Sequence, residues 1–463
     1  MRKYWLILSL IIFNESWSQE LDSSMSIEEF YQLVFSNHPL AKQAELIRER
    51  GERELAGSRG YFDPKLVSNY SIKEFDNKTY YDLWDSYVQL PTALNLDFKV
   101  GFERNAGYYL NPQNTVPGSG LYYAGVSVPI GNGLFVNERT YALRQGKLTK
   151  EQLENEASIV LNNLLLDANF TYWYWNASFQ KVKLFEEARD LALTRFNGLR
   201  ESVLAGDKAS IDSVESLIQV QQFQNEYLKS QAEFVSYSMA LQNMLWGDSS
   251  LSNSNPTEQF EVKKQELTFY EEFALQNHPD LIALNIKNAQ LNVDRRFYAE
   301  QLKPNLNLNY NFLMAGQGEP QSQQGFQTNN YKAGLNFSMP LLLRKERSKL
   351  SISKLKLSEN ELKTEQKNRE VLNKVRASFN QVSTYLSVIN QQRAAVENYE
   401  RMLAGERSKF DNGESSVFLV NSRENKLVEA RLKLIDMETT YRTYVGQLFW
   451  ASGYLPEYVR TLQ

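Results

Sequence analysis

The chain has 463 residues but no cysteine and only two histidines, His38 and His278. Without cysteine it can form no disulfide and offers no thiol nucleophile, so packing alone must hold the fold together. The histidines occupy equivalent positions of an internal repeat, and the further ligands that a metal site needs do not accompany them. Each precedes a proline, which predicts the junction at which a helix begins. Because no Ser-His-Asp order is present either, we predict that the protein is not an enzyme and needs no cofactor or metal.

The sequence also lacks a charge surplus and long apolar runs. Its formal net charge is −4, so no basic excess points to nucleic acid. Residues 1–18 combine a basic start, a short apolar run and small residues around Ser18, which predicts a signal peptide cleaved before Gln19. Beyond it, no stretch is long and apolar enough for a transmembrane helix. If the protein enters a membrane, we expect it to do so as a closed β-barrel.

What the sequence does contain is a duplication. Asn37-His38-Pro39 recurs as Asn277-His278-Pro279, and Gly206 has its counterpart in Gly413. Around these glycines, apolar residues are spaced alternately by four and three, in the same register in both halves. They are Ala168, Tyr172, Trp175, Phe179 and Val182 in the first half, and Val375, Phe379, Val382, Leu386 and Ile389 in the second. This spacing predicts a coiled-coil seam in each half.

Each half follows one order: a helical segment, an extended region, a very long helix, a glycine turn and a second helix. We predict a first repeat over 19–246, a linker over 247–266, a second repeat over 267–453 and a C-terminal tail over 454–463. The strands are expected at about 64–128 and 304–340, and the coiled-coil hairpins at about 137–246 and 344–450. Helices of sixty-odd residues extend roughly 100 Å, so an exported protein that contains them must bridge a distance.

The extended regions alternate between apolar and polar residues. Leu306, Leu308, Tyr310 and Phe312, for example, alternate with asparagines. Such alternation is typical of outer-membrane strands with lipid on one side and water on the other. Two strands per half give four per chain, whereas a membrane barrel needs at least ~8, so the barrel must be shared among subunits. The first half has a longer segment between Phe75 and Leu121, which forms either a hairpin at the barrel mouth or additional strands.

This duplicated unit resembles the TolC family of outer-membrane efflux proteins over nearly the whole chain. The motifs are the Asn-His-Pro triplets, the prolines that bound the strands (Pro64, Pro129, Pro304 and Pro340) and the two glycine turns. The resemblance implies a mainly helical homotrimer, in which three chains form a 12-stranded β-barrel on a long α-helical barrel. It places the protein in the bacterial outer membrane, surrounded by lipid, with a long helical extension into the periplasm.

By resemblance, the protein is a passive duct that exports small molecules in a tripartite efflux or secretion system. A periplasmic adaptor (membrane fusion) protein and an inner-membrane pump would be its partners. The alternatives are a type I protein secretion duct and a secreted coiled-coil scaffold without a pore. The adaptor is expected to dock at the periplasmic tip, at Gly206, Asp207, Ser210, Gly413, Glu414, Ser416 and Val417.

The pore constriction is expected close to this tip. Known members of the family carry aspartates six and nine residues after the second-half glycine. Here these positions are Leu419 and Ser422, and the first-half equivalents are Asp212 and Glu215. We therefore predict that side-chain packing and hydrophobic dewetting, rather than a ring of charge, close the tip.

Overall fold

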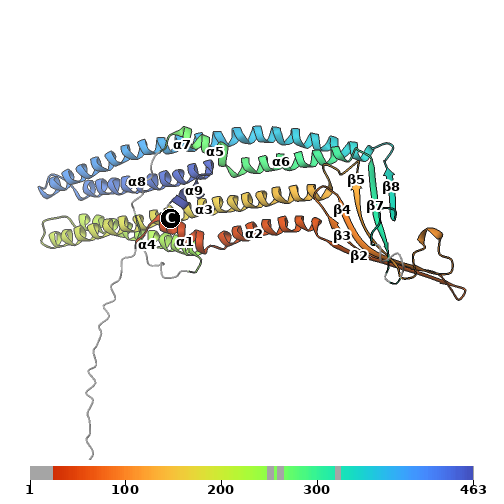
Figure 1. Cartoon of the computed structure of the whole chain (residues 1–463). Helices are drawn as coiled ribbons and strands as arrows, with labels where there is room; N and C mark the ends of the chain where they lie inside the picture. Colours follow the sequence, from red (N-terminus) through yellow and green to blue (C-terminus); the bar gives the residue numbers. More distant parts are fainter. Residues whose placement is uncertain (1–23, 248–254, 258–264, 317, 319–324, 462–463) are drawn as a thin grey trace, which may run out of the picture.

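The computed structural model describes residues 24–247, 255–257, 265–316, 318 and 325–461. The predicted signal peptide and most of the predicted linker lie outside these residues. The molecule is elongated, with its helices lying along its length and a curved sheet at one end (Figure 1). Within the described part of the chain, no helix is both long enough and apolar enough to cross a membrane.

The helices confirm the predicted order. The first half contains α1 (Ile27–Asn37), α2 (Pro39–Arg59), α3 (Glu138–Leu204) and α4 (Ser210–Leu245). The second half contains α5 (Leu267–Asn277), α6 (Pro279–Glu300), α7 (Arg344–Asp411), α8 (Val417–Ser452) and α9 (Leu455–Thr461). The long helices α3 and α7 have 67 and 68 residues, which corresponds to about 100 Å each. Two hairpins of almost equal length therefore run side by side away from the sheet.

Each histidine interrupts the first helical segment of its half. His38 Nδ1 accepts a hydrogen bond from the backbone N–H of Leu40, and His278 Nδ1 accepts one from Asp280, both at 3.2 Å. The imidazoles thus cap α2 and α6, whose first residues are prolines. This confirms the prediction that the histidines mark helix junctions.

The chain ends pack into the same core as the middle of the long helices. The short strands β1 (Ser24–Met25) and β6 (Asn255–Pro256) pair in parallel. The Tyr172 hydroxyl on α3 donates to the backbone oxygen of Met25 at 2.8 Å. The segment predicted as a C-terminal tail forms α9, whose buried Leu455 belongs to this core. The centre of the molecule is therefore its most heavily packed region.

The predicted seams are confirmed except at one position. Tyr172 and Trp175 are buried, and Phe379 and Val382 pack against the same core. The ring of Phe179 lies 5.6 Å from that of Phe234 on α4. Leu386, in contrast, is 39% exposed, and it lines an apolar groove formed by α7, α8 and Tyr270 of α5.

The curved sheet contains six antiparallel strands among the described residues. They are β2 (Lys65–Phe75), β3 (Lys78–Pro91), β4 (Asp97–Ala106), β5 (Leu121–Pro129), β7 (Asn305–Ala315) and β8 (Tyr331–Ser338), in that spatial order. The predicted count of two strands per half is wrong for the first half, which contributes four. The segment between Phe75 and Leu121 forms the additional strands β3 and β4 rather than a hairpin outside the sheet.

Candidate channel wall and helical tips

One face of the sheet is apolar across its whole width. The register brings Leu66, Val88 and Val100 side by side on β2, β3 and β4. On β5, β7 and β8 the same face carries Ala124, Val126, Val128, Leu308, Tyr310, Phe312, Ala333, Leu335 and Phe337. Many of these side chains are exposed, including Leu66 at 78% and Phe337 at 67%. An apolar surface of this extent requires an apolar medium or a partner to cover it.

The opposite face is polar and lies on the concave side. Lys332 on β8 approaches Glu103 on β4 to 4.0 Å, although β5 and β7 lie between the two strands. Strands are spaced about 4.8 Å apart, so this contact requires the sheet to curl around its polar face. The Tyr123 hydroxyl on β5 likewise donates to Asp85 on β3 at 2.8 Å. The sheet is thus a wall with a polar inside and an apolar outside.

The opposite end of the molecule consists of two glycine turns of the same construction. Gly206 has φ of +87° and Gly413 has φ of +79°, a conformation that glycine adopts at little cost. After each glycine, the next backbone N–H bonds back to the end of the long helix, Asp207 to Ser202 at 2.9 Å and Glu414 to Lys409 at 2.8 Å. These are the bonds of a Schellman helix terminus. The duplication therefore extends to the backbone of the tips.

The predicted docking residues divide into exposed and buried ones. Gly206, Asp207, Ser210, Gly413, Glu414 and Ser416 are exposed. Val417, in contrast, is only 2% exposed, so its side chain packs inside the tip and is not available for docking. The side chain of Ser416 caps α8 by accepting from the Leu419 N–H, whereas Ser210 is the first residue of α4 and follows a cap, Ala209, that makes no such bond.

The predicted constriction residues lie on neighbouring helices. Asp212 and Glu215 are half-buried on α4, whereas Leu419 is 38% exposed and Ser422 half-buried on α8. Further along the same helices, the side-chain amides of Gln219 and Asn425 bond to each other at 2.6 and 3.1 Å. The structure therefore brings the four residues to the same end of the molecule on two packed helices.

The sequence of the second repeat identifies the family. Residues 272–453 match the family model of the outer membrane efflux proteins. The match covers the second repeat, so this part of the chain is an outer membrane efflux protein domain. Members of this family are channels rather than enzymes, so the chain is not an enzyme. Among curated proteins, no sequence matches this chain.

Solved structures share the fold of this chain over nearly its whole length. The CmeC outer membrane channel of Campylobacter jejuni is 15% identical, with a TM-score of 0.64 over 94% of this chain and 89% of that one. VceC of Vibrio cholerae is 11% identical, with a TM-score of 0.66 over 92% of this chain and 96% of that one. The open state of the MtrE channel of Neisseria gonorrhoeae is 11% identical, with a TM-score of 0.64 over 92% and 88%.

The structure also shows a buried ionic group near the helical tips that the sequence analysis did not predict. Glu424 on α8 is 3% exposed and forms ion pairs with Arg195 on α3 and, at 3.1 Å, with Arg407 on α7. One carboxylate thereby ties three helices and both hairpins together. A signal was present in the sequence, because Val420, Glu424 and Leu427 follow the four-and-three spacing of the seam.

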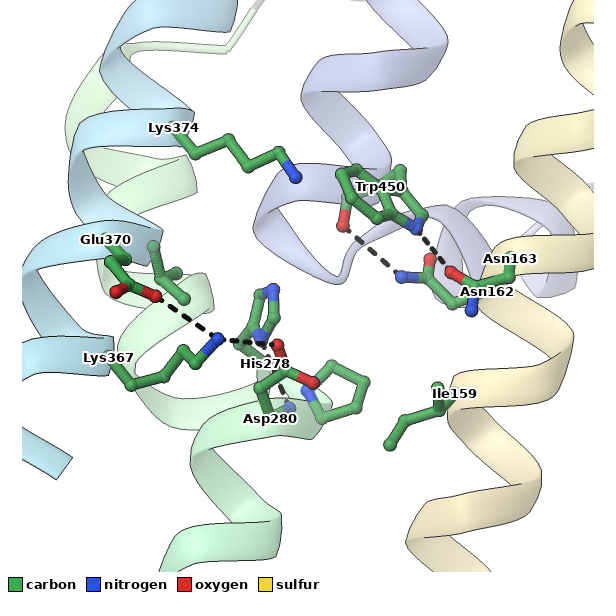
Figure 2. Close-up of a pocket in the computed structure, with 11 residues that line it drawn as sticks. Ile159, Asn162, Asn163, His278, Asp280, Lys367, Glu370, Lys374 and Trp450 are labelled. Atoms are coloured by element: carbon green, nitrogen blue, oxygen red, sulfur yellow. Dashed lines mark hydrogen bonds and ion pairs between the residues drawn. The ribbon is translucent and has the colours of Figure 1, made fainter. Parts of the chain in front are cut away.

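A recess of about 290 Å³ lies where the two halves of the chain meet (Figure 2). Its charged groups already pair with one another, since Lys367 lies 3.5 Å from Asp280 and 3.3 Å from Glu370. The Lys374 ammonium lies 3.8 Å from the centre of a Trp450 ring, and burial lowers the pKa of both Lys374 and His278. Among the described residues, no group of three or more potential ligands could hold a metal. We therefore interpret the recess as part of the contact between the two repeats and not as a ligand site.

Proposed function

We propose that this chain is the outer-membrane channel of a tripartite export system, a passive duct for small molecules. The observation that supports the proposal is that one chain contains both a two-faced sheet and very long helical hairpins. At one end is a sheet with an apolar convex face and a polar concave face, and at the other are helical hairpins of about 100 Å. The sheet suits a membrane wall with a wet lumen, and the hairpins suit a passage across the periplasm.

A single sheet of six described strands cannot close a membrane barrel, which needs at least ~8 strands. Several chains must therefore share the barrel, and we propose the homotrimer that the family resemblance implies, embedded in outer-membrane lipid. A periplasmic adaptor protein would dock at the exposed tip residues, and an inner-membrane pump would supply energy. Cell fractionation and cross-linking in mild detergent test this assembly. The protein should resist extraction from the outer membrane without detergent, and its main cross-linked species should contain three chains. A folded, detergent-stable monomer, or release by salt alone, would contradict it.

We further propose that the tip closes by packing rather than by a ring of charge. Leu419 is the residue at the aligned constriction position, and the neighbouring Phe418 is 64% exposed. Multivalent cations added on the periplasmic side of a planar bilayer should then block the conductance only weakly. Leu419→Asp should create strong block, because three carboxylates would face a narrow lumen. Tight block of the unmodified protein, abolished by neutralising Asp212 or Glu215, would show instead that an acidic gate lies on the first hairpin.

A further inference from the structure

The duplication identifies which strands of the two halves are equivalent. Pro64 and Tyr70 lie 240 residues before Pro304 and Tyr310, so β2 corresponds to β7. Pro129 and Pro340, which end the last strand of each half, make β5 correspond to β8. In the second half β7 pairs directly with β8, whereas in the first half β3 and β4 lie between β2 and β5. The hairpin β3–β4 is thus an insertion between two strands that the duplication would make neighbours.

Polar contacts on the concave face build this hairpin into the wall. The Tyr123 side chain crosses β4 above Gly101 to reach Asp85 on β3. A Cβ atom at Gly101 would lie 2.6 Å from the Tyr123 ring, so only glycine leaves room for this crossing. At the helical end, Arg139 in the first turn of α3 pairs with Asp97 on β4 at 2.6 Å. The hairpin is therefore fixed to both the next strand and the long helix.

On the convex face, apolar side chains of the hairpin continue the apolar surface of β5, although Ser86, Asp82 and Arg104 lie on the same face. The Trp84 ring on β3 lies 6.0 Å from Phe102 on β4, which in turn lies 4.9 Å from Tyr122 on β5. Val88 and Val100 are neighbours on the same face. If the hairpin lay outside the wall, its apolar residues would not need to stand in register with those of the neighbouring strands. The medium that covers β5, β7 and β8 must also cover β3 and β4.

We propose that all six described strands belong to the membrane wall, so that three chains close a barrel of eighteen strands rather than twelve. This inference rests on the proposed trimeric channel. The β8 edge of one chain pairs with the β2 edge of the next, and the two strands run antiparallel. Because barrel diameter grows roughly linearly with strand number, the passage through the membrane is about one and a half times as wide as in a twelve-stranded barrel.

The duplication also predicts the register between chains. Within one chain, Gly125 on β5 pairs with Asn311 on β7. Their counterparts are Asn336 on β8 and Ser71 on β2, which should pair across the subunit boundary. The adjacent pair would then be Phe337 with Tyr70, two apolar residues that are 67% and 62% exposed in the single chain. Polar residues meet polar ones and apolar residues meet apolar ones, as a continuous wall requires.

The cysteine-free chain allows a direct test by disulfide cross-linking of the full-length protein in outer-membrane preparations. Asn336→Cys combined with Ser71→Cys should give a covalent ladder that ends at three chains on a denaturing gel. In a twelve-stranded barrel that keeps the strand order of the single chain, β2 and β3 would lie outside the wall and β8 would pair with β4. Two further double variants test that arrangement. They combine Asn336→Cys with Lys99→Cys or with Asn105→Cys on β4. Each single-cysteine variant serves as the control.

The outcomes separate this inference from the proposed function. A three-chain ladder for the Ser71 pair, with little product for the β4 pairs, supports eighteen strands. A dominant product with either β4 position overturns the inference while leaving the trimeric channel intact. The same holds if amine cross-linking shows intact trimers but none of them contains the Ser71 disulfide. A product confined to single chains, or ladders beyond three, would overturn both the strand count and the trimer.

Discussion

Removing the charge of Glu424 should weaken the helical tips far more than removing its exposed partner. The Glu424 side chain is 4% exposed, compared with 14% for Arg195 and 43% for Arg407. Glutamine at this position keeps the shape but leaves the Arg195 guanidinium buried without a counter-charge. Breaking a buried ion pair typically costs ~3–5 kcal/mol. An ion pair with a largely exposed partner contributes about 0–1 kcal/mol, so Arg407→Gln, which leaves the Arg195 pair in place, is the matched control.

These free energies convert into measurable shifts of the thermal midpoint. Unfolding entropy is about 2.1 cal/mol/K per residue, so cooperative unfolding of 463 residues involves about 1 kcal/mol/K. Glu424→Gln should therefore lower the midpoint by about 3–5 °C, and Arg407→Gln by less than about 1 °C. Far-UV circular dichroism of the detergent-purified protein follows the helical transition.

A double variant provides the sharper check. Replacing Glu424 by leucine and Arg195 by methionine removes both charges from the seam, so no buried charge is left without a partner. Such replacements are often neutral or stabilising. The double variant should therefore recover most of the stability that Glu424→Gln loses. Equal shifts for Glu424→Gln and Arg407→Gln, or a double variant less stable than Glu424→Gln, would refute the argument from burial.

Two further predictions concern the centre of the molecule. Trp175 is 2% exposed, so Trp175→Ala should cost ~3–5 kcal/mol, whereas Ala at Tyr174, 43% exposed, should have a much smaller effect on the thermal midpoint. Burial lowers the pKa of His278, so below about pH 6.5 the unfolded chain takes up the proton first and stability is lost as the pH falls. His278→Asn keeps an acceptor for the helix cap but cannot titrate. Its thermal midpoint should fall less than that of the unmodified protein between about pH 7.5 and about pH 5, and identical pH profiles would contradict the prediction.

The helices were predictable because their signals are local. Asn137 caps α3 with its side chain on the Thr140 N–H, and Gly206 and Gly413 end the long helices in the left-handed conformation. Between these limits, the four-and-three spacing of apolar residues fixes which side of each helix is buried. The predicted starts of the two hairpins, at about 137 and 344, and their turns at Gly206 and Gly413 therefore agree with the ends of α3 and α7 to within a residue or two.

The sheet and the ionic group were less predictable because they depend on contacts distant in sequence. In β3, the apolar Leu83 and Tyr87 stand on the polar face and hide the alternation that Trp84 and Val88 would otherwise display. Their positions are acceptable only because the sheet curls and side chains meet across it. Glu424 occupies a seam position at which the spacing predicts an apolar residue. A buried carboxylate is possible there because Arg195, on the other hairpin, forms an ion pair with it.

The pairing of β5 with β7 has a consequence for the order of folding. Leu121 lies opposite Ala315, so the two strands can meet only after the whole first hairpin between them has been synthesised. The helical hairpins close through contacts between residues near one glycine turn, and such local contacts form much earlier than distant strand pairs. We therefore expect the helices to form first, while the apolar face of β2–β5 still lacks both β7 and lipid. A chain in this condition is prone to aggregate through its open strand edges, so we expect a partner to hold its extended apolar segments until the sheet is complete.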